Sequence, residues 1–359
     1  MIVNTDCLHY RGDRPCDPHK RYDVHCTDCR HYVPAGERIL IIKLGAAGDV
    51  IRTTPLLRKL KKEHPAARIT WLTEYPDFVP SSVNHVIKPD ASSLFWLAAR
   101  RFDIIYNLDK DPVAISLTVR THAEHKFGFG MDDFGNCKPI NPGSMGKWYT
   151  GIWDDISRHN RKSYPQEIFE MCGYAFSGER YILEKRVSKN WQIHQRQPLI
   201  GLNTGCGGRW PSRLWPDEFW IELATRLKRD GFGVLWLGGP QEHEKNLNLS
   251  KGAGGDYKGC HPLDVFVDLV DQCDVVITQV TMTMHIAIGL EKRLVLMNNI
   301  FNPNEFELYG LGEIVEPPVP CGCYFAPHCP HDSMRQIKPS MIRAAVLRQV
   351  AELAENTAA

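Results

Sequence analysis

A short apolar strand pattern that runs into a glycine turn and then into a helix pattern constrains the fold of this chain most. Residues 39–42 are all isoleucine or leucine, the turn Gly45-Ala-Ala-Gly48 follows, and a helical pattern begins at Asp49. A continuous apolar run of this kind is typical of a parallel strand that is buried on both faces. We therefore expect the turn to lie at the carboxyl edge of a parallel sheet, where open α/β folds bind ligands.

The turn has the spacing G-x-x-G-D, which fits neither the dinucleotide fingerprint nor the phosphate-binding P-loop. Its distinguishing group is the carboxylate of Asp49, which stands at a helix start beside two glycines that let a ligand approach the main chain. Aspartate is a common helix cap and also a common general base. From these residues alone both roles remain open.

Length and charge limit the class of protein. A chain of 359 residues suits two domains of about 150 residues each. The net charge of +1 gives no global field that favours nucleic acid or strong attraction to a membrane. No apolar stretch approaches the ~20 residues of a spanning helix, and the first residues lack the apolar core of a signal peptide. We expect a cytoplasmic protein that does not bind nucleic acid.

Strand and helix patterns alternate twice along the chain, which predicts two parallel α/β units with right-handed crossovers. We expect a cysteine-rich arm over 1–35, Rossmann-like domains over 36–176 and 177–338 that face each other across a cleft, and a C-terminal helix over 339–359. We expect a long functional loop over 129–164 and a polar linker between the domains over 177–197. The expected strands are 39–43, 68–72, 104–108, 199–203, 233–237, 275–278 and 294–297, and the expected helices are 53–63, 92–101, 166–172, 216–229, 263–273, 284–290 and 339–355.

The cysteines form two groups that suggest metal sites. With no export signal, the twelve cysteines are better explained as thiols or metal ligands than as disulfides. Cys7, Cys16, Cys26 and Cys29 stand in a segment otherwise too polar to fold, and a structural zinc bound by the four thiolates would order it. The alternative is a disordered arm with free thiols.

A second, weaker group lies in a proline-rich turn near the C-terminus. Cys321, Cys323 and Cys329, together with His331, supply three thiolates and one imidazole for a zinc or an iron ion.

Three segments together resemble glycosyltransferase family 9, the ADP-heptose-dependent heptosyltransferases of bacterial lipopolysaccharide assembly. They are residues 43–55 (KLGAAGDVIRTTP), 201–219 (GLNTGCGGRWPSRLWPDEF) and 276–290 (VITQVTMTMHIAIGL). The resemblance implies a GT-B fold, no catalytic metal, and inversion at the anomeric carbon. It also implies an ADP-sugar donor and a phosphorylated or lipid-linked glycan acceptor, with peripheral contact at the inner membrane.

The resemblance also assigns roles to residues. Asp49 matches the catalytic base, and Arg213 matches the basic residue, usually lysine, that neutralises the donor diphosphate. Thr204 and Gly205 would donate to the same phosphates, and Glu242 would accept the ribose hydroxyls. Thr281 and His285 persist in the third segment, where His285 contacts the diphosphate or simply packs. An anionic acceptor would meet Lys43, Gly45, Gly48, Arg52 and Arg120 on the N-terminal domain.

One departure leaves the substrate open. Relatives of this kind carry Asp-Thr-Gly where this chain has Val280, Thr281 and Met282. The loss of an acid beside the donor allows another nucleotide sugar, or transfer to a non-lipopolysaccharide glycan or to a protein. A catalytically silent nucleotide-sugar scaffold is the alternative from another class, and retention of Asp49 argues against it.

Overall fold

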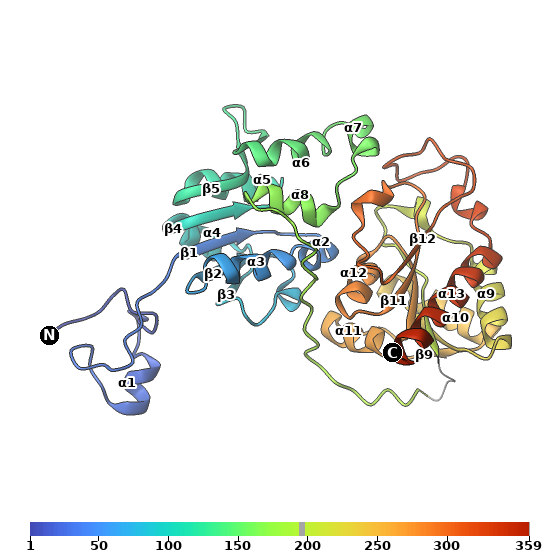
Figure 1. Ribbon diagram of the computed structural model, residues 1–359, viewed down its shortest axis with the longest axis horizontal. Helices are drawn as coiled ribbons and strands as arrows, with labels where there is room; N and C mark the ends of the chain where they lie inside the picture. Colours follow the sequence, from blue (N-terminus) through green and yellow to red (C-terminus); the bar gives the residue numbers. More distant parts are fainter. Residues whose placement is uncertain (194–197, 359) are drawn as a thin grey trace.

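The structure is a computed structural model that describes residues 1–193 and 198–358. It consists of two α/β domains, joined by a long extended segment, and a separate N-terminal arm (Figure 1). Each domain contains one six-stranded sheet. The two-domain α/β architecture predicted from the sequence is therefore confirmed.

The N-terminal domain has the strand order β3-β2-β1-β4-β5-β6, and all neighbours are parallel except β5 and β6. Strand β1 is central, and its residues Ile39, Leu40, Ile41 and Ile42 are fully buried, as the continuous apolar run predicts. The elements of this domain are β1 (Arg38–Ile42), α2 (Ala47–Ile51), α3 (Pro55–Glu63), β2 (Arg68–Leu72), β3 (His85–Ile87), α4 (Ala91–Ala98), β4 (Arg101–Asn107), α5 (Pro112–Arg120), β5 (His122–Met131), β6 (Cys137–Pro139), α6 (Met145–Tyr149), α7 (Asp154–His159) and α8 (Tyr164–Met171).

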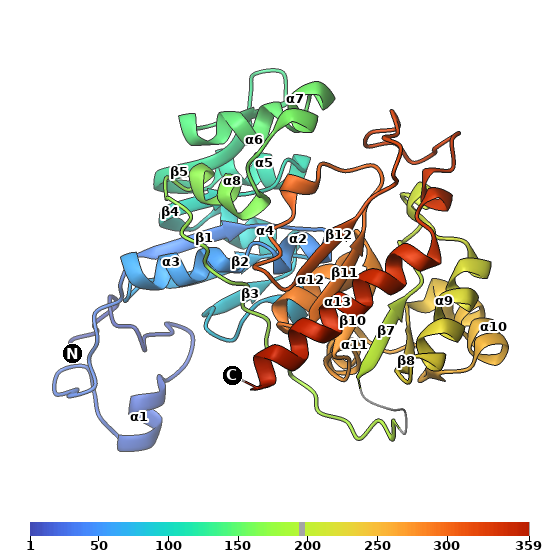
Figure 2. The same ribbon diagram turned by 45° about the vertical axis from the view of Figure 1, so that its right-hand side comes forward.

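The C-terminal domain is wholly parallel, with the order β12-β11-β10-β7-β8-β9. Helix α13 (Pro339–Ala358) lies across the face of this sheet (Figure 2) and buries Ile342 and Val346 against it. The other elements are β7 (Leu199–Asn203), α9 (Asp217–Arg229), β8 (Gly233–Leu237), α10 (His243–Ala253), β9 (Asp256–Tyr257), α11 (Leu263–Asp271), β10 (Val275–Gln279), α12 (Met282–Gly289), β11 (Arg293–Met297) and β12 (Gly312–Val315), with short 3-10 helices at Pro211–Arg213, Pro240–Glu242 and Pro303–Glu305.

The expected long loop over 129–164 is wrong. This region contains the end of β5, the antiparallel strand β6 and the short helices α6 and α7, with α8 starting at Tyr164. The first half of β5 is largely exposed and carries histidine, glutamate and lysine, so it lacks an apolar alternation. Helices α6 and α7 have five and six residues and bury none of them, which leaves no helical apolar stripe in the sequence.

The extended segment between the domains carries no helix or strand over 173–193, and the predicted linker end at 194–197 lies outside the described residues. It nevertheless buries Tyr181 and Trp191, and Arg58 of α3 donates to the carbonyl of Arg180 at 2.9 Å. Apolar side chains of both domains belong to one continuous core cluster. The two domains therefore share a packed interface as well as a covalent connection.

The N-terminal arm is ordered mainly by turns. Helix α1 (Asp17–Tyr22) buries only Pro18, and an isolated bridge pairs Cys7 with Pro34. Its apolar residues Ile2, Val3 and Tyr22 are more than half exposed. Among the described residues, no helix is long and apolar enough to cross a bilayer.

Candidate active site

Asp49 sits in the first turn of α2, directly beyond the carboxyl end of the central strand β1. Its Oδ2 accepts the main-chain N–H of Ala46 at 3.1 Å, and its Oδ1 accepts Arg52 Nε at 2.9 Å. Lys43 Nζ lies 3.7 Å from Oδ2. The side chain is still 30% exposed, so a ligand can reach it. The capping contact predicted as one alternative exists, and it leaves the carboxylate accessible.

The charge of Asp49 is fixed by its neighbours. Burial by itself would raise the pKa of this carboxyl, but the charges of Arg52 and Lys43 and the hydrogen bond from Ala46 outweigh it and hold the pKa well below its ordinary value. Asp49 is therefore an anion at neutral pH. Such a group accepts a proton only from a strongly acidified donor.

A cavity of about 260 Å³ opens beside Asp49 at the boundary of the two domains. Sequence reasoning missed Asp109, which organises one wall of it. Asp109 Oδ2 accepts the N–H of Leu44 at 3.0 Å and Lys43 Nζ at 3.1 Å. The polar run that follows β4 at the same sheet edge is the signal that could have revealed this residue.

Most cations that line this cavity are paired. Arg52 bridges Asp49 and Glu305 of the C-terminal domain, at 2.8 Å from each, and its guanidinium stacks 3.5 Å from the centre of the Tyr164 ring. Lys147 pairs with the buried Glu167 at 2.7 Å. No signal in the sequence pointed to these last residues, because helices α6 and α8 reach the cavity only through tertiary packing.

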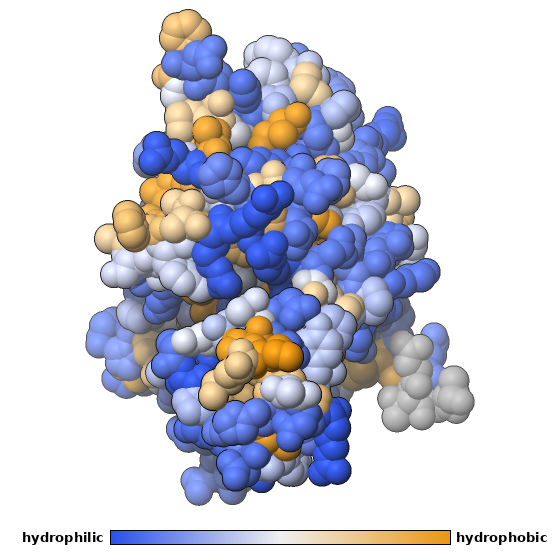
Figure 3. Space-filling model, turned by 90° about the vertical axis from the view of Figure 1, so that its left-hand side faces the viewer, coloured by the Kyte–Doolittle hydropathy of each residue, from blue (hydrophilic) through white to orange (hydrophobic). Residues whose placement is uncertain are grey.

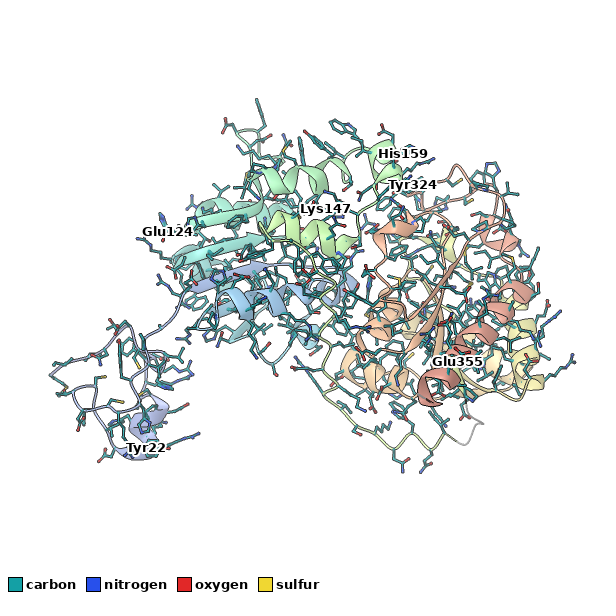
Figure 4. The ribbon with its side chains drawn as sticks, in the orientation of Figure 1. Tyr22, Glu124, Lys147, His159, Tyr324 and Glu355 are labelled. Atoms are coloured by element: carbon teal, nitrogen blue, oxygen red, sulfur yellow. The ribbon has the colours of Figure 1, made fainter. Side chains whose placement is uncertain are left out.

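Lys110 is the exception among these cations. Its Nζ donates to the main-chain carbonyl of Lys147 at 3.0 Å, and no carboxylate of the described chain lies within 4.0 Å of it. Burial, and next the charge of Lys147, lowers the pKa of Lys110 to about 8. Lys147 belongs to α6 and lies between α6 and α8 in Figure 4, and it also lines the cavity.

The other residues predicted to bind the acceptor differ in position. Lys43 and Arg52 line the cavity. Gly48 packs against α12, where a Cβ would lie 2.5 Å from His285 Cδ2, so this glycine is needed for helix contact. Arg120 is exposed at the end of α5, next to the amino-terminal ends of β4 and β5. It therefore lies at the opposite edge of the sheet from Asp49, and its assignment to the acceptor site is not supported.

Across the boundary, Arg213 is buried at the carboxyl edge of the second sheet. Its guanidinium donates to three main-chain carbonyls, those of Cys206 at 2.7 Å, of Trp210 at 3.5 Å and of Val280. The side chain is 8% exposed, and no described carboxylate lies within ion-pair distance. Burial lowers the pKa of Arg213 from its ordinary value. A buried guanidinium without a counter-charge favours an anionic ligand.

Three further predicted donor residues lie on loops after the adjacent strands β7, β8 and β10. Glu242 contacts Gly205 closely and accepts the N–H of Gly239 at 2.9 Å. Thr281 is the N-cap of α12 and accepts the N–H of Thr283 at 3.2 Å. These groups share the sheet edge of Arg213, which is the ligand-binding edge of such a sheet.

Thr204 and His285 are engaged in internal contacts. The Thr204 hydroxyl is buried and donates to Asn246 at 2.6 Å, so its side chain is not free for a ligand. His285 Nδ1 lies 3.3 Å from the hydroxyl of Tyr181, and burial, and next Arg52, lowers the pKa of His285 to about 3. His285 is thus a neutral residue that packs α12 against α2, which favours the packing role over a charged phosphate contact.

The two cysteine groups differ in geometry. Sulfur atoms of Cys321, Cys323 and Cys329 lie within 4.8 Å of one another, and His331 is not part of this group. The four arm cysteines line one cavity of about 190 Å³ together with His9, His19 and His25. Within the described chain, their sulfurs are not drawn together into a comparable group. The zinc site of the arm stays a prediction.

Two Rossmann-like domains, one with a partly exposed carboxylate and the other with a buried arginine at the carboxyl edge of its sheet, have the architecture of GT-B glycosyltransferases. The sequence profile described as Glycosyltransferase family 9 (heptosyltransferase) matches residues 96–311, more than half of the chain. The chain belongs to this family and is a glycosyltransferase.

Individual relatives are distant. Lipopolysaccharide heptosyltransferase 2 of Salmonella typhimurium is 22% identical over 297 residues, which cover 74% of this chain and 84% of the relative. The structure of ADP-heptose lps heptosyltransferase II of E. coli has a TM-score of 0.64 and 18% identity, and covers 88% of this chain and 99% of its own. The iron-containing dodecameric glycosyltransferase TibC of enterotoxigenic E. coli H10407 has a TM-score of 0.57 and 13% identity, with 89% and 77% covered. These structures share the fold.

Proposed function

We propose that this glycosyltransferase transfers a heptose, or a related sugar, from an ADP-sugar to a hydroxyl of a lipopolysaccharide-type glycan, with inversion and with Asp49 as the general base. The observation that carries the proposal is the buried, unneutralised Arg213 on one domain together with the ionised, reachable Asp49 on the other. The names of the relatives, which refer to ADP-heptose and lipopolysaccharide, support the substrate classes.

On the donor side, Arg213 would pair with the diphosphate and stabilise the charge that grows on the departing ADP. The N-terminus of α12 at Thr281 adds main-chain donors and the positive end of a helix dipole. Glu242 would accept the ribose hydroxyls, and the missing side chain of Gly205 leaves room for Glu242 itself. Thr204 supplies no free donor, because its hydroxyl donates to Asn246 and its main-chain N–H donates to the Leu237 carbonyl at 3.2 Å.

In the transfer step, the acceptor oxygen bonds to the anomeric carbon as the bond from this carbon to the diphosphate breaks. The acceptor proton passes to a carboxylate oxygen of Asp49. Because the pKa of Asp49 is held low, the proton moves late, when the attacking oxygen has become acidic. Lys110 provides the uncompensated charge for an anionic group of the acceptor.

The departure at Val280–Met282 keeps a second candidate open within the same reaction class. Position 280 carries valine, so its main-chain carbonyl, and no side-chain acid, accepts the hydrogen bond from Arg213. Another nucleotide sugar as donor, or a protein as acceptor, is therefore compatible with the same site residues. A screen of ADP-, GDP- and UDP-sugars for thermal stabilisation and slow hydrolysis tests the donor. Stabilisation by ADP-heptose supports the first candidate. Stronger stabilisation by another nucleotide sugar contradicts the first candidate and supports the second.

We also propose structural metal ions at both cysteine groups and no metal in catalysis. Three clustered thiols suit a zinc or iron ion, and the iron-containing nature of TibC supports the C-terminal group, with His331 as a candidate fourth ligand. In the arm, zinc would draw Cys7, Cys16, Cys26 and Cys29 together in the cavity that they already line.

Metal analysis of the purified protein tests both sites separately. The Cys26→Ala variant should lose about one equivalent of metal and become more sensitive to protease within residues 1–35, whereas Cys323→Ala should lose the other equivalent. Unchanged metal content in either variant contradicts the corresponding site.

The proposed partners are a nucleotide sugar and a glycan acceptor, with peripheral contact at the inner membrane.

A further inference from the structure

A large cavity lies away from the active site. Its volume is about 740 Å³, and it lies between the N-terminal arm and the amino-terminal ends of the strands β1, β2 and β4. Asp49 follows the opposite, carboxyl-terminal end of β1. Figure 3 looks onto the side of the molecule that carries the arm, and strongly hydrophilic side chains gather on the surface above it. We call this space the arm–sheet cavity.

Four arginines line the arm–sheet cavity, and the acidic residues in it already have partners. Asp6 accepts the Tyr32 hydroxyl at 2.6 Å. Glu37 lies 2.5 Å from His64 Nδ1. Asp103 accepts both the main chain and the guanidinium of Arg38, at 2.6 and 3.2 Å. Each lining acid therefore already accepts a hydrogen bond within the protein. One of the four arginines, Arg38, forms an ion pair with Asp103.

The other three arginines are Arg11 from the arm and Arg68 and Arg100 from the domain. In the described part of the chain, no carboxylate lies within 4.0 Å of any of them. Arg68 is held in place because it donates to the Leu8 carbonyl at 3.2 Å and to His85 Nε2 at 3.1 Å. Arg100 stacks 4.2 Å from the centre of the Trp96 ring. The orientation of Arg68 and Arg100 is thus set by contacts within the protein.

The electrostatics agree with an excess of positive charge. Burial, and next the charge of Arg11, lowers the pKa of Arg68, and burial, followed by Arg38 and Arg68, lowers the pKa of Arg100. His85 has a lowered pKa because of burial and then of Arg68, Arg100 and Arg11. These cations repel one another, and a bound anion would relieve that repulsion.

We propose that the arm–sheet cavity is a second binding site, separate from the catalytic cleft, for a phosphate-bearing ligand held by Arg11, Arg68 and Arg100. Planar guanidinium groups bind phosphate oxygens in pairs, and three of them suit a dianion. The volume is in the range of small-ligand sites. Because Arg11 comes from the arm and the others from the sheet, the ligand would fasten the arm to the domain.

The phosphate could belong to a soluble compound or to a lipid headgroup. The neighbouring helix α4 exposes 81% of Phe95 and 42% of Trp96, next to Arg100. Aromatic and basic side chains side by side are typical of surfaces that rest on a membrane interface. The test therefore needs a separate measurement for each source.

Calorimetric titration of the full-length protein with inorganic pyrophosphate tests the site. The Arg213→Ala background is used throughout, because pyrophosphate can also occupy the donor site. We expect binding in this background, and at least about tenfold weaker binding after Arg11→Gln or Arg100→Gln, because each removes a charge-assisted partner of the phosphate. Arg101→Gln, an exposed neighbour outside the cavity, is the matched control and should bind normally. Absent binding, or binding unaffected by the Arg11 and Arg100 variants, would overturn the proposal.

Flotation with phosphatidylcholine vesicles, with and without phosphatidic acid, identifies the source of the phosphate. Vesicle binding that needs phosphatidic acid and is lost in the Arg11→Gln variant assigns a lipid headgroup. Pyrophosphate binding without vesicle binding assigns a soluble ligand. Circular dichroism and unfolding curves confirm that each variant is folded, and transfer activity in the Arg213-containing protein reports separately on the proposed function.

Discussion

Arg52 is partly buried and Arg213 is buried, but the first has carboxylate partners and the second donates only to main-chain carbonyls. The two side chains therefore differ in whether their charge is compensated within the protein. Arg52 is neutralised by Asp49 and Glu305 and so positions Asp49 and ties the domains together. Arg213 has no such partner in the described chain and is therefore available to a diphosphate.

Asp49→Asn should slow transfer by about 10²–10⁴-fold, because the amide cannot accept the acceptor proton. The affinity for ADP should stay unchanged, since the donor groups belong to the other domain. Stability should fall by about 1 kcal/mol, because Arg52 keeps Glu305 and Lys43 keeps Asp109. Steady-state kinetics and calorimetry check this. A folded variant that turns over at the wild-type rate would leave Asp49 as a helix cap only.

Arg213→Ala should weaken ADP binding by about ten- to hundredfold, the usual effect of losing hydrogen bonds to a charged group. Arg213→Lys is the matched control and should recover much of the affinity, because an ammonium group can still neutralise the diphosphate. Calorimetric titration with ADP measures both. Equal affinity in the wild type and the alanine variant would show that the diphosphate binds elsewhere.

The acceptor KM should rise as the pH increases through about 8, because Lys110 then loses its proton and its attraction for an anionic acceptor. Lys147, Glu167, Cys137 and Lys43 face Lys110 and contribute to this pKa. Lys110→Arg carries a charge that does not titrate in this range, so its KM should stay flat from about pH 7 to 9. A wild-type profile that is equally flat would mean that Lys110 does not meet the acceptor charge.

Among the elements, the pair α2 and α12 decides how the two domains meet. Helix α2 carries Asp49, the proposed base, and α12 begins at the sheet edge proposed for the donor. The two helices contact at Gly48 and His285. A side chain at position 48 would separate them. The close packing of these short helices therefore couples the geometry of the two halves of the site.

Gly48→Ala should destabilise the protein by about 1–3 kcal/mol, because the new methyl group overlaps the His285 ring. In an open helix position the same substitution ordinarily stabilises. At Gly146 of α6 an added methyl group would have nothing within 4 Å, so Gly146→Ala is the matched control and should be neutral or slightly stabilising. Urea unfolding compares the two. A neutral Gly48→Ala would show that the helices can move apart at no cost.

At the scale of the whole molecule, the loop that carries the C-terminal cysteines also closes the cavity beside Asp49. Arg158 of α7 donates to the Gly322 carbonyl at 2.8 Å, and the Ser157 hydroxyl lies 2.7 Å from the Tyr324 hydroxyl. Figure 4 shows Tyr324 beside α7, across the domain boundary. Phe325 lines the cavity itself. We therefore expect the order of this loop to affect the cavity beside Asp49.

Removal of metal by a strong chelator should raise the acceptor KM several-fold, because Phe325 of the cysteine loop lines the cavity proposed for the acceptor. It should also weaken ADP binding, because the carbonyls of Ala326 and Pro327 in this loop accept hydrogen bonds from Ser212, next to Arg213. The Cys26→Ala variant, which is expected to lack the arm metal, should respond to the chelator in the same way. Steady-state kinetics before and after chelation measure the effect. Equal KM values in both states would separate the cysteine group from acceptor binding.

Much of the fold followed from local patterns. Strands β2, β7 and β8 have the predicted bounds, since continuous apolar runs between turn residues are a local property of buried parallel strands. Helices α6 and α7 were missed because they bury no residues, and β5 because its exposed half is polar. Their positions depend on packing against distant parts of the chain.

The sequence by itself determined the two α/β domains and the family. It also placed Asp49 and Arg213 at the carboxyl edges of their sheets, because the residues that follow an apolar run in the sequence mark the end of the strand. Only the tertiary structure decided that Arg52 bridges to Glu305 and that Lys110 lacks a carboxylate partner within the described chain. It also decided that Arg120 lies at the opposite edge of the sheet from Asp49, and that His285 packs against Gly48. These facts depend on which residues meet across elements far apart in the chain. Ion pairs and packing contacts depend on the distance between two side chains in space, and the spacing of residues along the sequence does not give that distance.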